Sequence, residues 1–361
     1  MSEFSLETYL SNGVETIVKG AIKASLKNPK ESLFMAQYAL ASKKARELRR
    51  KAEAYEEHIP PFLIASITSQ CNLHCAGCYA RANHACQDKK AIDQLSDMEW
   101  KRIFEEAKVL GISFILLAGG EPLVRKDVIS MAATMKEILF PIFTNGTMIE
   151  EEYIKLFKDY RNLVPVISIE GNEETTNERR GPYVYQKVMK AMNSMQDNGI
   201  LYGASVTVTK KNILEVTNQE FIDQLYMRGC KVVFYVEYVP VDGKTKELAP
   251  MQEEREVMTA QLAKLREMYD DLLFISFPGD EKSSGGCLAA GRGFFHINSH
   301  GGAEPCPFSP YSDTNLRNTS LKDALHSPLF QKLQNSGTLI EEHVGGCVLF
   351  EKEEIVKELV G

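Results

Sequence analysis

The feature that most constrains this chain is a series of six apolar runs that alternate with segments of helical periodicity. Most of the runs are continuously apolar, without the polar alternation of a half-buried strand. Continuous apolar strands separated by helices are typical of a parallel sheet covered by helices. The runs lie at residues 61–68, 112–120, 140–146, 163–171, 202–210 and 231–239.

Right-handed crossovers between such strands curl the sheet into an open or closed barrel. We therefore predict an α/β fold built on a partial (β/α)6 TIM-like barrel over residues 61–270. Residues 1–60 read as an N-terminal helical segment. Residues 271–361 read as a small α+β extension with a β-hairpin around a glycine turn at 298–302. Functional groups are expected at the carboxyl ends of the barrel strands.

Composition and charge exclude several classes of protein. The 361 residues carry a net charge of −7, whereas proteins that bind nucleic acids are usually basic. No apolar run is long enough to cross a bilayer, and the start of the chain does not resemble a secretory signal. We expect a cytoplasmic protein, in which the eight cysteines serve as metal ligands, redox groups or buried thiols and not as disulfides.

Three of these cysteines, Cys71, Cys75 and Cys78, follow the first predicted strand at a spacing of C-x3-C-x2-C. On a helix they would share one face, but Asn72 and Gly77 between them disfavour a helix core. A structural zinc site usually needs four ligands in paired knuckles. Iron–sulfur clusters are held by cysteine thiolates, normally four. Three cysteines leave one iron without a protein ligand, and that iron can bind a substrate or cofactor.

The run CNLHCAGCY after the first strand of a βα barrel resembles the radical S-adenosylmethionine (radical SAM) enzymes, in the branch with a C-terminal SPASM or twitch extension. The resemblance implies that Cys71, Cys75 and Cys78 hold a [4Fe–4S] cluster whose open iron binds S-adenosylmethionine. It also implies reductive cleavage of this cofactor to a 5′-deoxyadenosyl radical, which removes a hydrogen atom from the substrate.

Further motifs at the strand ends are similar to the family's cofactor pocket. GGEP follows the second strand, TNG the third, and SIEG the fourth, where the family often has Ser-x-Asp-Gly. The fifth strand borders the adenine in the family, and a residue after the third cysteine can pack on the cofactor. The residues that the resemblance assigns to the cofactor are Tyr79, Gly119, Gly120, Glu121, Asn145, Ser168, Glu170, Val206 and Thr207.

Cysteines in the extension resemble the opening of the SPASM and twitch regions. Cys287 and Cys306 flank Gly301 at the matching spacing, and Cys347 follows, but the longer cysteine series of a two-cluster extension is absent. We predict one auxiliary iron–sulfur cluster held by these three cysteines. Its fourth ligand is not assigned, and Cys230 is one candidate. Free buried thiols are the alternative. Cys86 is either a supplementary ligand or a spare thiol.

The substrate is left open between a peptide or protein side chain and a small molecule. Glu237 is a weak candidate for a catalytic base, against the alternative of a salt-bridged carboxylate. A flavodoxin- or ferredoxin-like electron donor is the implied partner. Two other classes remain: an iron–sulfur electron-transfer or carrier protein that does not cleave S-adenosylmethionine, and a zinc-binding structural protein.

Overall fold

The computed structural model describes residues 29–89, 92–241, 243, 245–277, 285–340 and 347–360. The strands are β1 (Phe62–Ser66), β2 (Phe114–Ala118), β3 (Phe140–Thr144), β4 (Leu163–Ser168), β5 (Gly203–Val208), β6 (Val232–Glu237), β7 (Leu273–Phe277), β8 (His296–Ile297) and β9 (Ala303–Glu304). The barrel helices are α3 (Tyr79–Ala82), α4 (Asp97–Leu110), α5 (Lys126–Thr134), α6 (Glu151–Asp159), α7 (Glu173–Arg180), α8 (Val184–Asp197), α9 (Ile213–Val216), α10 (Gln219–Met227) and α11 (Gln252–Met268). The others are α2 (Pro29–Glu53) before the barrel and α12 (Leu321–Leu325), α13 (Pro328–Asn335), α14 (Val348–Glu351) and α15 (Glu353–Val360) after it.

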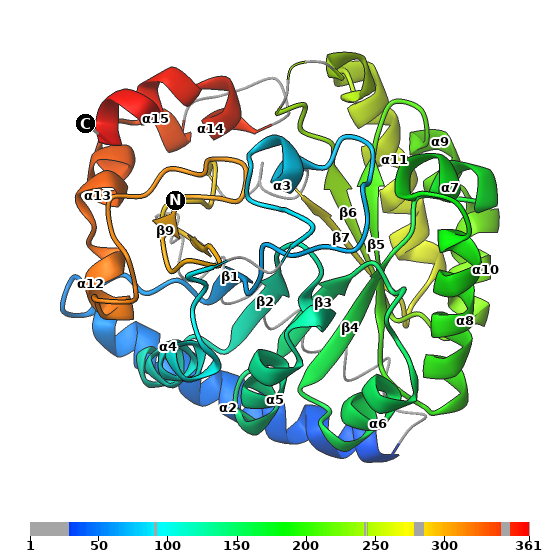
Figure 1. The fold of residues 1–361 in the computed structure, drawn as a ribbon, viewed down its shortest axis with the longest axis horizontal. Helices are drawn as coiled ribbons and strands as arrows, with labels where there is room; N and C mark the ends of the chain where they lie inside the picture. The colour runs from blue at the N-terminus through cyan, green and yellow to red at the C-terminus, as the bar shows by residue number, and fades with distance from the viewer. Residues whose placement is uncertain are drawn as a thin grey trace.

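The strands form one sheet in the order β7-β6-β5-β4-β3-β2-β1-β8-β9, with helices on its outer face (Figure 1). Neighbours from β7 to β8 pair in parallel, and only β8 and β9 are antiparallel. This confirms the predicted α/β partial barrel. It also adds a seventh barrel strand, β7, which the sequence analysis did not expect because it ended the barrel at residue 270.

Helix α4 shows how local sequence produces these elements. Ser96 and Glu99 form a capping box at its start, and Gly111 in the left-handed conformation ends it. Trp100, Ile103 and Phe104 recur at helical spacing and are fully buried. The apolar face of the helix thus packs into the main core.

The two edges of the parallel sheet meet through aromatic side chains. The ring of Phe294 lies 5.1 Å from that of Phe62 on β1 and 6.0 Å from that of Phe277 on β7, centroid to centroid. In the part of the chain that the structure describes, no backbone ladder joins β7 to β8 or β9. The barrel is therefore incomplete, and its interior is not constrained to the tight layers of a closed eight-stranded barrel.

Helix α2 runs across the lower side of the barrel, shown in dark blue in Figure 1. The Tyr38 hydroxyl donates to the Ser113 carbonyl at 2.8 Å, and Arg49 donates to the Gly111 carbonyl at 2.6 Å. Buried Glu31 pairs with Arg161. These contacts fix α2 at the amino ends of the strands, opposite the ends where function is expected.

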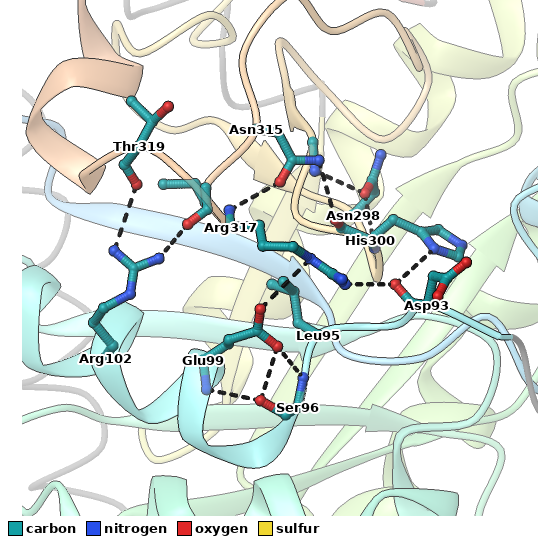
Figure 2. A network of polar contacts seen from close by, with 12 residues as sticks. Asp93, Leu95, Ser96, Glu99, Arg102, Asn298, His300, Asn315, Arg317 and Thr319 are labelled. Carbon is teal, nitrogen blue, oxygen red and sulfur yellow. Dashed lines mark hydrogen bonds and ion pairs between the residues drawn. The ribbon is translucent and has the colours of Figure 1, made fainter.

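The extension is attached to the barrel by a polar network next to α4 (Figure 2). Arg317 donates to the Asp93 carbonyl at 2.6 Å, and the His300 ring contacts the same oxygen at 3.3 Å. Arg102 on α4 donates to the carbonyls of Leu316 and Thr319. The segment just after the cysteine loop is therefore held by the extension.

A second, buried network joins the hairpin to β1. His296 lies 2.7 Å from the Ser66 hydroxyl through Nε2 and 2.7 Å from Glu304 through Nδ1. Asn298 donates to the other oxygen of Glu304. The division into segments 1–60, 61–270 and 271–361 stays a prediction, but the sheet itself continues past residue 270 through β7 and β8. Residues 1–28, part of the predicted N-terminal segment, lie outside the described residues.

Candidate functional site

One large cavity of about 1040 Å3 occupies the inside of the barrel. Its lining includes residues from both ends of the strands, from Phe62 and Phe114 at the amino ends to Gly119, Asn145 and Glu237 at the carboxyl ends. Pockets for small molecules usually measure about 300–1,000 Å3, so this cavity has room for a cofactor and more.

The predicted cluster loop opens onto this cavity. Cys71, Cys75 and Cys78 all belong to its lining and are half-buried. The loop is fixed by backbone hydrogen bonds, from the Cys71 amide to Gln87 at 3.0 Å and from the Ala76 amide to Arg179 at 2.7 Å. Three thiols on one ordered loop therefore face the same space.

Cys86 is the fourth thiol of this cavity lining. Its side chain is buried and hydrogen-bonds with that of Cys71. This contact is the main cause that lowers the pKa of Cys71 to about 6, against the effect of burial. Cys86 is thus part of the site, and the alternatives of a supplementary ligand and a spare thiol both stay predictions.

The donors of the cavity are thiols, which as thiolates are the usual ligands of iron–sulfur clusters. Among the residues that the structure describes, no three His, Cys, Asp or Glu side chains converge on one ion-sized position. A tetrahedral ion with bonds of about 2.3 Å needs its sulfur ligands within about 3.8 Å of one another. Thiolates around a four-iron cluster are spaced more widely, because each binds a different iron.

The glycines after β2 are required by the cluster loop itself. An added Cβ would lie 2.3 Å from the Thr68 carbonyl oxygen at Gly119 and 2.2 Å from the Gln70 carbonyl oxygen at Gly120. The amide of Gly120 donates to Thr68 at 2.8 Å. From the family resemblance, both glycines were expected to contact the cofactor. The structure shows close approach of the loop backbone, although both glycines also line the cavity.

Gly119→Ala is therefore expected to displace the cluster loop and to reduce iron incorporation severalfold. Gly119 combines a φ of +134° with the collision at Thr68. Gly181→Ala is the matched control, because its φ is +108° and its Cβ would meet nothing within 4 Å. Iron per protein after anaerobic reconstitution measures the effect. Equal iron in the two variants would contradict the steric explanation.

Glu121 is buried behind the cavity wall and is not among the lining residues. Its carboxylate accepts from the Leu123 amide at 3.0 Å, the Thr144 hydroxyl at 2.7 Å and the Asn145 amide at 2.7 Å. Burial raises the pKa of Glu121 to about 7, although these hydrogen bonds oppose the rise. Glu121 therefore links the carboxyl ends of β2 and β3 through hydrogen bonds. Its contact with the cofactor stays a prediction.

Several other predicted cofactor residues do meet at the cavity. Asn145 lines it and donates to Asn72 of the cluster loop at 2.9 Å. Tyr79 lines it with its ring 4.9 Å from that of Phe308 in the extension. Ser168 and Thr207 also belong to the lining, whereas Val206 is fully buried in the core.

Glu170 holds two arginines that the sequence analysis did not single out. It accepts from Arg179 Nη1 at 2.8 Å and from Arg180 Nε at 2.7 Å, and its other oxygen accepts from the Thr207 amide at 3.0 Å. Burial alone would raise the pKa of Glu170, but the two arginines hold it below its usual range. Glu170 itself is fully buried and does not line the cavity.

Both arginines line the cavity next to the cysteines. Arg180 Nη1 lies 4.0 Å from the Cys75 sulfur. They place positive charge where thiolates and a carboxylate-bearing cofactor would lie. The signal in the sequence was the pair Arg179–Arg180, nine and ten residues after Glu170.

Glu237, the weak candidate base, lines the cavity but is paired with Arg255. The Arg255 Nε atom lies 2.9 and 3.0 Å from its two oxygens. This is the salt-bridged alternative of the sequence analysis. A catalytic role for Glu237 stays a prediction.

The extension brings its three predicted ligands together. The thiols of Cys306 and Cys347 hydrogen-bond with each other, and Cys287 is near enough to raise the pKa of Cys306 further above the value that burial gives it. Cys230 does not join them, since its thiol donates to the Val232 carbonyl at 3.3 Å in the barrel core. None of these four is part of the cavity lining, although Pro307 and Phe308 after Cys306 are.

Comparison with known proteins bears on this arrangement. The family model described as "Radical SAM superfamily" matches residues 65–223, from the end of β1 into α10. Residues 65–223 thus form a radical SAM domain. Its match begins at the strand before the cysteine loop, and the similar proteins agree with the SPASM/twitch branch that the extension resembles.

Three curated relatives of this chain are informative. Fe-coproporphyrin III synthase of Methanosarcina barkeri (strain Fusaro / DSM 804) is 31% identical over 43% of this chain, but the match spans only 39% of that relative. AdoMet-dependent heme synthase of the same strain is 26% identical over 82% of this chain and 90% of its own length. PqqA peptide cyclase of Rhizobium meliloti (strain 1021) is 26% identical over 69% of this chain and 68% of its own.

A solved structure has a similar fold. Streptococcus suis SuiB bound to S-adenosylmethionine superposes with a TM-score of 0.70, covering 86% of this chain and 79% of that one. At 18% sequence identity the similarity shows the fold alone. In the part of the chain that the structure describes, no helix is both long and apolar enough to span a bilayer.

Proposed function

We propose that this protein cleaves S-adenosylmethionine reductively and uses the resulting radical to remove a hydrogen atom from a substrate. The observation that carries the proposal is the set of three thiols, Cys71, Cys75 and Cys78, on a loop that opens into the barrel cavity. When bound there, a [4Fe–4S] cluster with S-adenosylmethionine supplies methionine and a 5′-deoxyadenosyl radical.

The residues around the thiols form two groups, those that line the cavity and those that lie behind its wall. Gly119, Gly120, Asn145, Ser168 and Thr207 line the cavity beside the loop and would surround the cofactor. Arg179 and Arg180 would pair with its carboxylate or screen the cluster's charge.

Glu121, Glu170 and Val206 act from behind the wall. Glu121 fixes the strand ends, and Glu170 orients the arginines. Val206 packs in the core beneath the site. Tyr79 and Phe308 seal the side toward the extension and so limit access of water to a radical.

The extension cysteines support a second part of the proposal. Cys287, Cys306 and Cys347 would hold one auxiliary iron–sulfur cluster, with a fourth ligand that is not Cys230, given the position of that thiol in the core. Tyr79 is near both sets of cysteines, since it directly follows Cys78 and its ring packs against Phe308, two residues after Cys306.

The triple variant C71A/C75A/C78A is expected to retain iron if the auxiliary cluster exists. The remaining iron should then be lost when Cys306→Ala is added, because Cys306 hydrogen-bonds with Cys347 and lies near Cys287. Iron and sulfide analysis after anaerobic reconstitution checks this. Background iron already in the triple variant would remove the second cluster from the proposal.

Substrate, electron donor and location are the less specific parts of the proposal. Relatives named for tetrapyrrole synthesis and for peptide cyclisation are both similar to this chain, so a small molecule and a peptide are both compatible. A flavodoxin- or ferredoxin-like protein would supply the electron. All eight cysteines are free thiols in the structure, which favours a reducing, cytoplasmic location.

Anaerobic reconstitution followed by dithionite and S-adenosylmethionine tests the function. The expected products are 5′-deoxyadenosine and methionine, measured by chromatography. Fully loaded protein that releases neither, even with its substrate, would leave the electron-carrier alternative in place. Zinc in place of iron would favour the structural alternative.

A further inference from the structure

The deeper part of the barrel cavity is lined by apolar side chains that remain partly exposed to the lumen. Phe62 and Ile64 come from β1, Leu116 from β2, and Phe234 and Val236 from β6. All five are only partly buried, although they point into the inside of the barrel. Apolar surface left open inside a protein is unfavourable, at about 25 cal/mol for each Å2.

From this lining we infer that the cavity binds a bulky, uncharged hydrocarbon group of the substrate, below the space that S-adenosylmethionine would occupy. The inference deepens the proposed function and rests on it for the position of the cofactor. It selects a small molecule with an extended aliphatic or aromatic part over a charged or hydrophilic peptide segment.

The far end of the cavity is closed by α2. Met35 and Tyr38 are buried there and belong to the lining, together with Leu139. The Tyr38 hydroxyl is directed to the Ser113 carbonyl, so the phenol presents its ring and not a free polar group to the lumen. A ligand in this space meets a hydrophobic floor.

The opposite walls are aromatic and aliphatic as well. Phe143 on β3 and Phe234 on β6 pack edge to face at 5.1 Å between ring centroids. Leu273, Ile275 and Phe277 of β7 line the side near the open edge of the barrel. Flat rings and branched chains on all sides suit a ligand that has bulk but few polar atoms.

Charged residues of the lining are already engaged within the protein. Arg179 and Arg180 pair with Glu170, and Glu237 pairs with Arg255. Arg266 donates to the Phe274 carbonyl at 3.1 Å, and Asp270 is exposed at the surface. A ligand with several charges deep in the lumen would have to break these pairs, whereas a neutral chain would not.

Binding of a neutral fluorescent probe, 1-N-phenylnaphthylamine, to the anaerobically reconstituted protein with S-adenosylmethionine tests this inference. We expect saturable binding and displacement by n-alkanols from n-hexanol to n-dodecanol. Each added methylene should lower the displacement constant about fourfold until the lumen is full. No saturable binding, or displacement that does not depend on chain length, would overturn the inference.

A matched pair of variants locates the binding. Leu116→Trp fills the lumen and is expected to weaken probe binding at least tenfold, while Leu40→Trp on the outer face of α2, where Leu40 is 73% exposed, leaves it unchanged. If Leu116→Trp does not fold, Ile275→Trp fills the lumen from β7. Equal probe binding in the lumen variant and the control would place the site elsewhere and refute the inference.

The two levels of proposal fail separately. Probe binding needs no turnover, so a chain that binds alkanols but releases no 5′-deoxyadenosine would refute the proposed function only. A chain that releases 5′-deoxyadenosine but binds no neutral ligand would refute the apolar substrate class only.

Discussion

Replacing Cys71, Cys75 or Cys78 by alanine is expected to reduce 5′-deoxyadenosine formation to background. Each thiol would bind a different iron, so the loss of one leaves a second iron without a protein ligand and prevents stable assembly of the cluster. Iron and sulfide content and the absorbance of the reconstituted protein should fall in parallel with product. The expected change is at least a thousandfold in rate, since no other group in the cavity can replace the cluster.

Cys230→Ala is the control for these substitutions. Cys230 is fully buried, but its thiol donates to Val232 in the core and does not line the cavity. Its loss removes one small side chain and should leave cluster content and cleavage near the unmodified level. Product formation that survives in Cys75→Ala would contradict the assignment of the loop.

Glu170→Gln is expected to have the largest effect on stability, a loss of about 3–5 kcal/mol in the free energy of unfolding at neutral pH. The substitution leaves Arg180, whose side chain is 9% exposed, without its carboxylate partner. It also places the amide N–H groups of glutamine among the donors that Glu170 accepts from, such as the Thr207 amide. Anaerobic urea unfolding followed by circular dichroism measures it. Binding of S-adenosylmethionine should weaken as well, because both arginines lose their orientation.

Glu178→Gln on the same helix provides the matched control. Glu178 and its partner Lys211 are 64% and 65% exposed. An exposed pair contributes about 0–1 kcal/mol, so this variant should unfold close to the unmodified protein. Similar losses in the two variants would show that helix α7, and not the buried ion pairs, responds to substitution.

The same carboxylate predicts a pH dependence. The pKa of Glu170 in the folded protein lies below its ordinary value of 4.5, because the arginines outweigh burial. The contribution of ionised Glu170 to the free energy of unfolding is fully present above about pH 4.5. It is lost as the pH falls through the pKa of Glu170 in the folded protein, because the unfolded chain binds more protons than the folded protein in this range. In Glu170→Gln this part of the acid dependence should disappear.

Much of the fold could be read from periodicity. The apolar runs predicted as strands at 140–146 and 163–171 correspond to β3 (Phe140–Thr144) and β4 (Leu163–Ser168). Such elements are specified by contacts within a few residues, as the capping box of α4 shows. In the extension, the helical segment is divided into α12 and α13, with Pro328 in the first turn of the second.

Features that depend on contacts between residues far apart in the chain were not predicted from the sequence. The strand β7 is only five residues long and is defined by its register with β6. The need for Gly119 and Gly120 arises from a loop about fifty residues earlier in the chain. The role of Glu170 is known only once its oxygens are seen on Arg179, Arg180 and Thr207.

The sequence by itself determined the alternating fold, the three-cysteine loop after β1 and the presence of a radical SAM domain, because residues close together in the chain carry these signals. Tertiary structure alone decided which groups meet. Arg180 reaches Cys75 across 105 residues, and His296 reaches Ser66 across 230. Side chains this far apart are brought together by the pairing and packing of whole elements, which local sequence patterns do not encode.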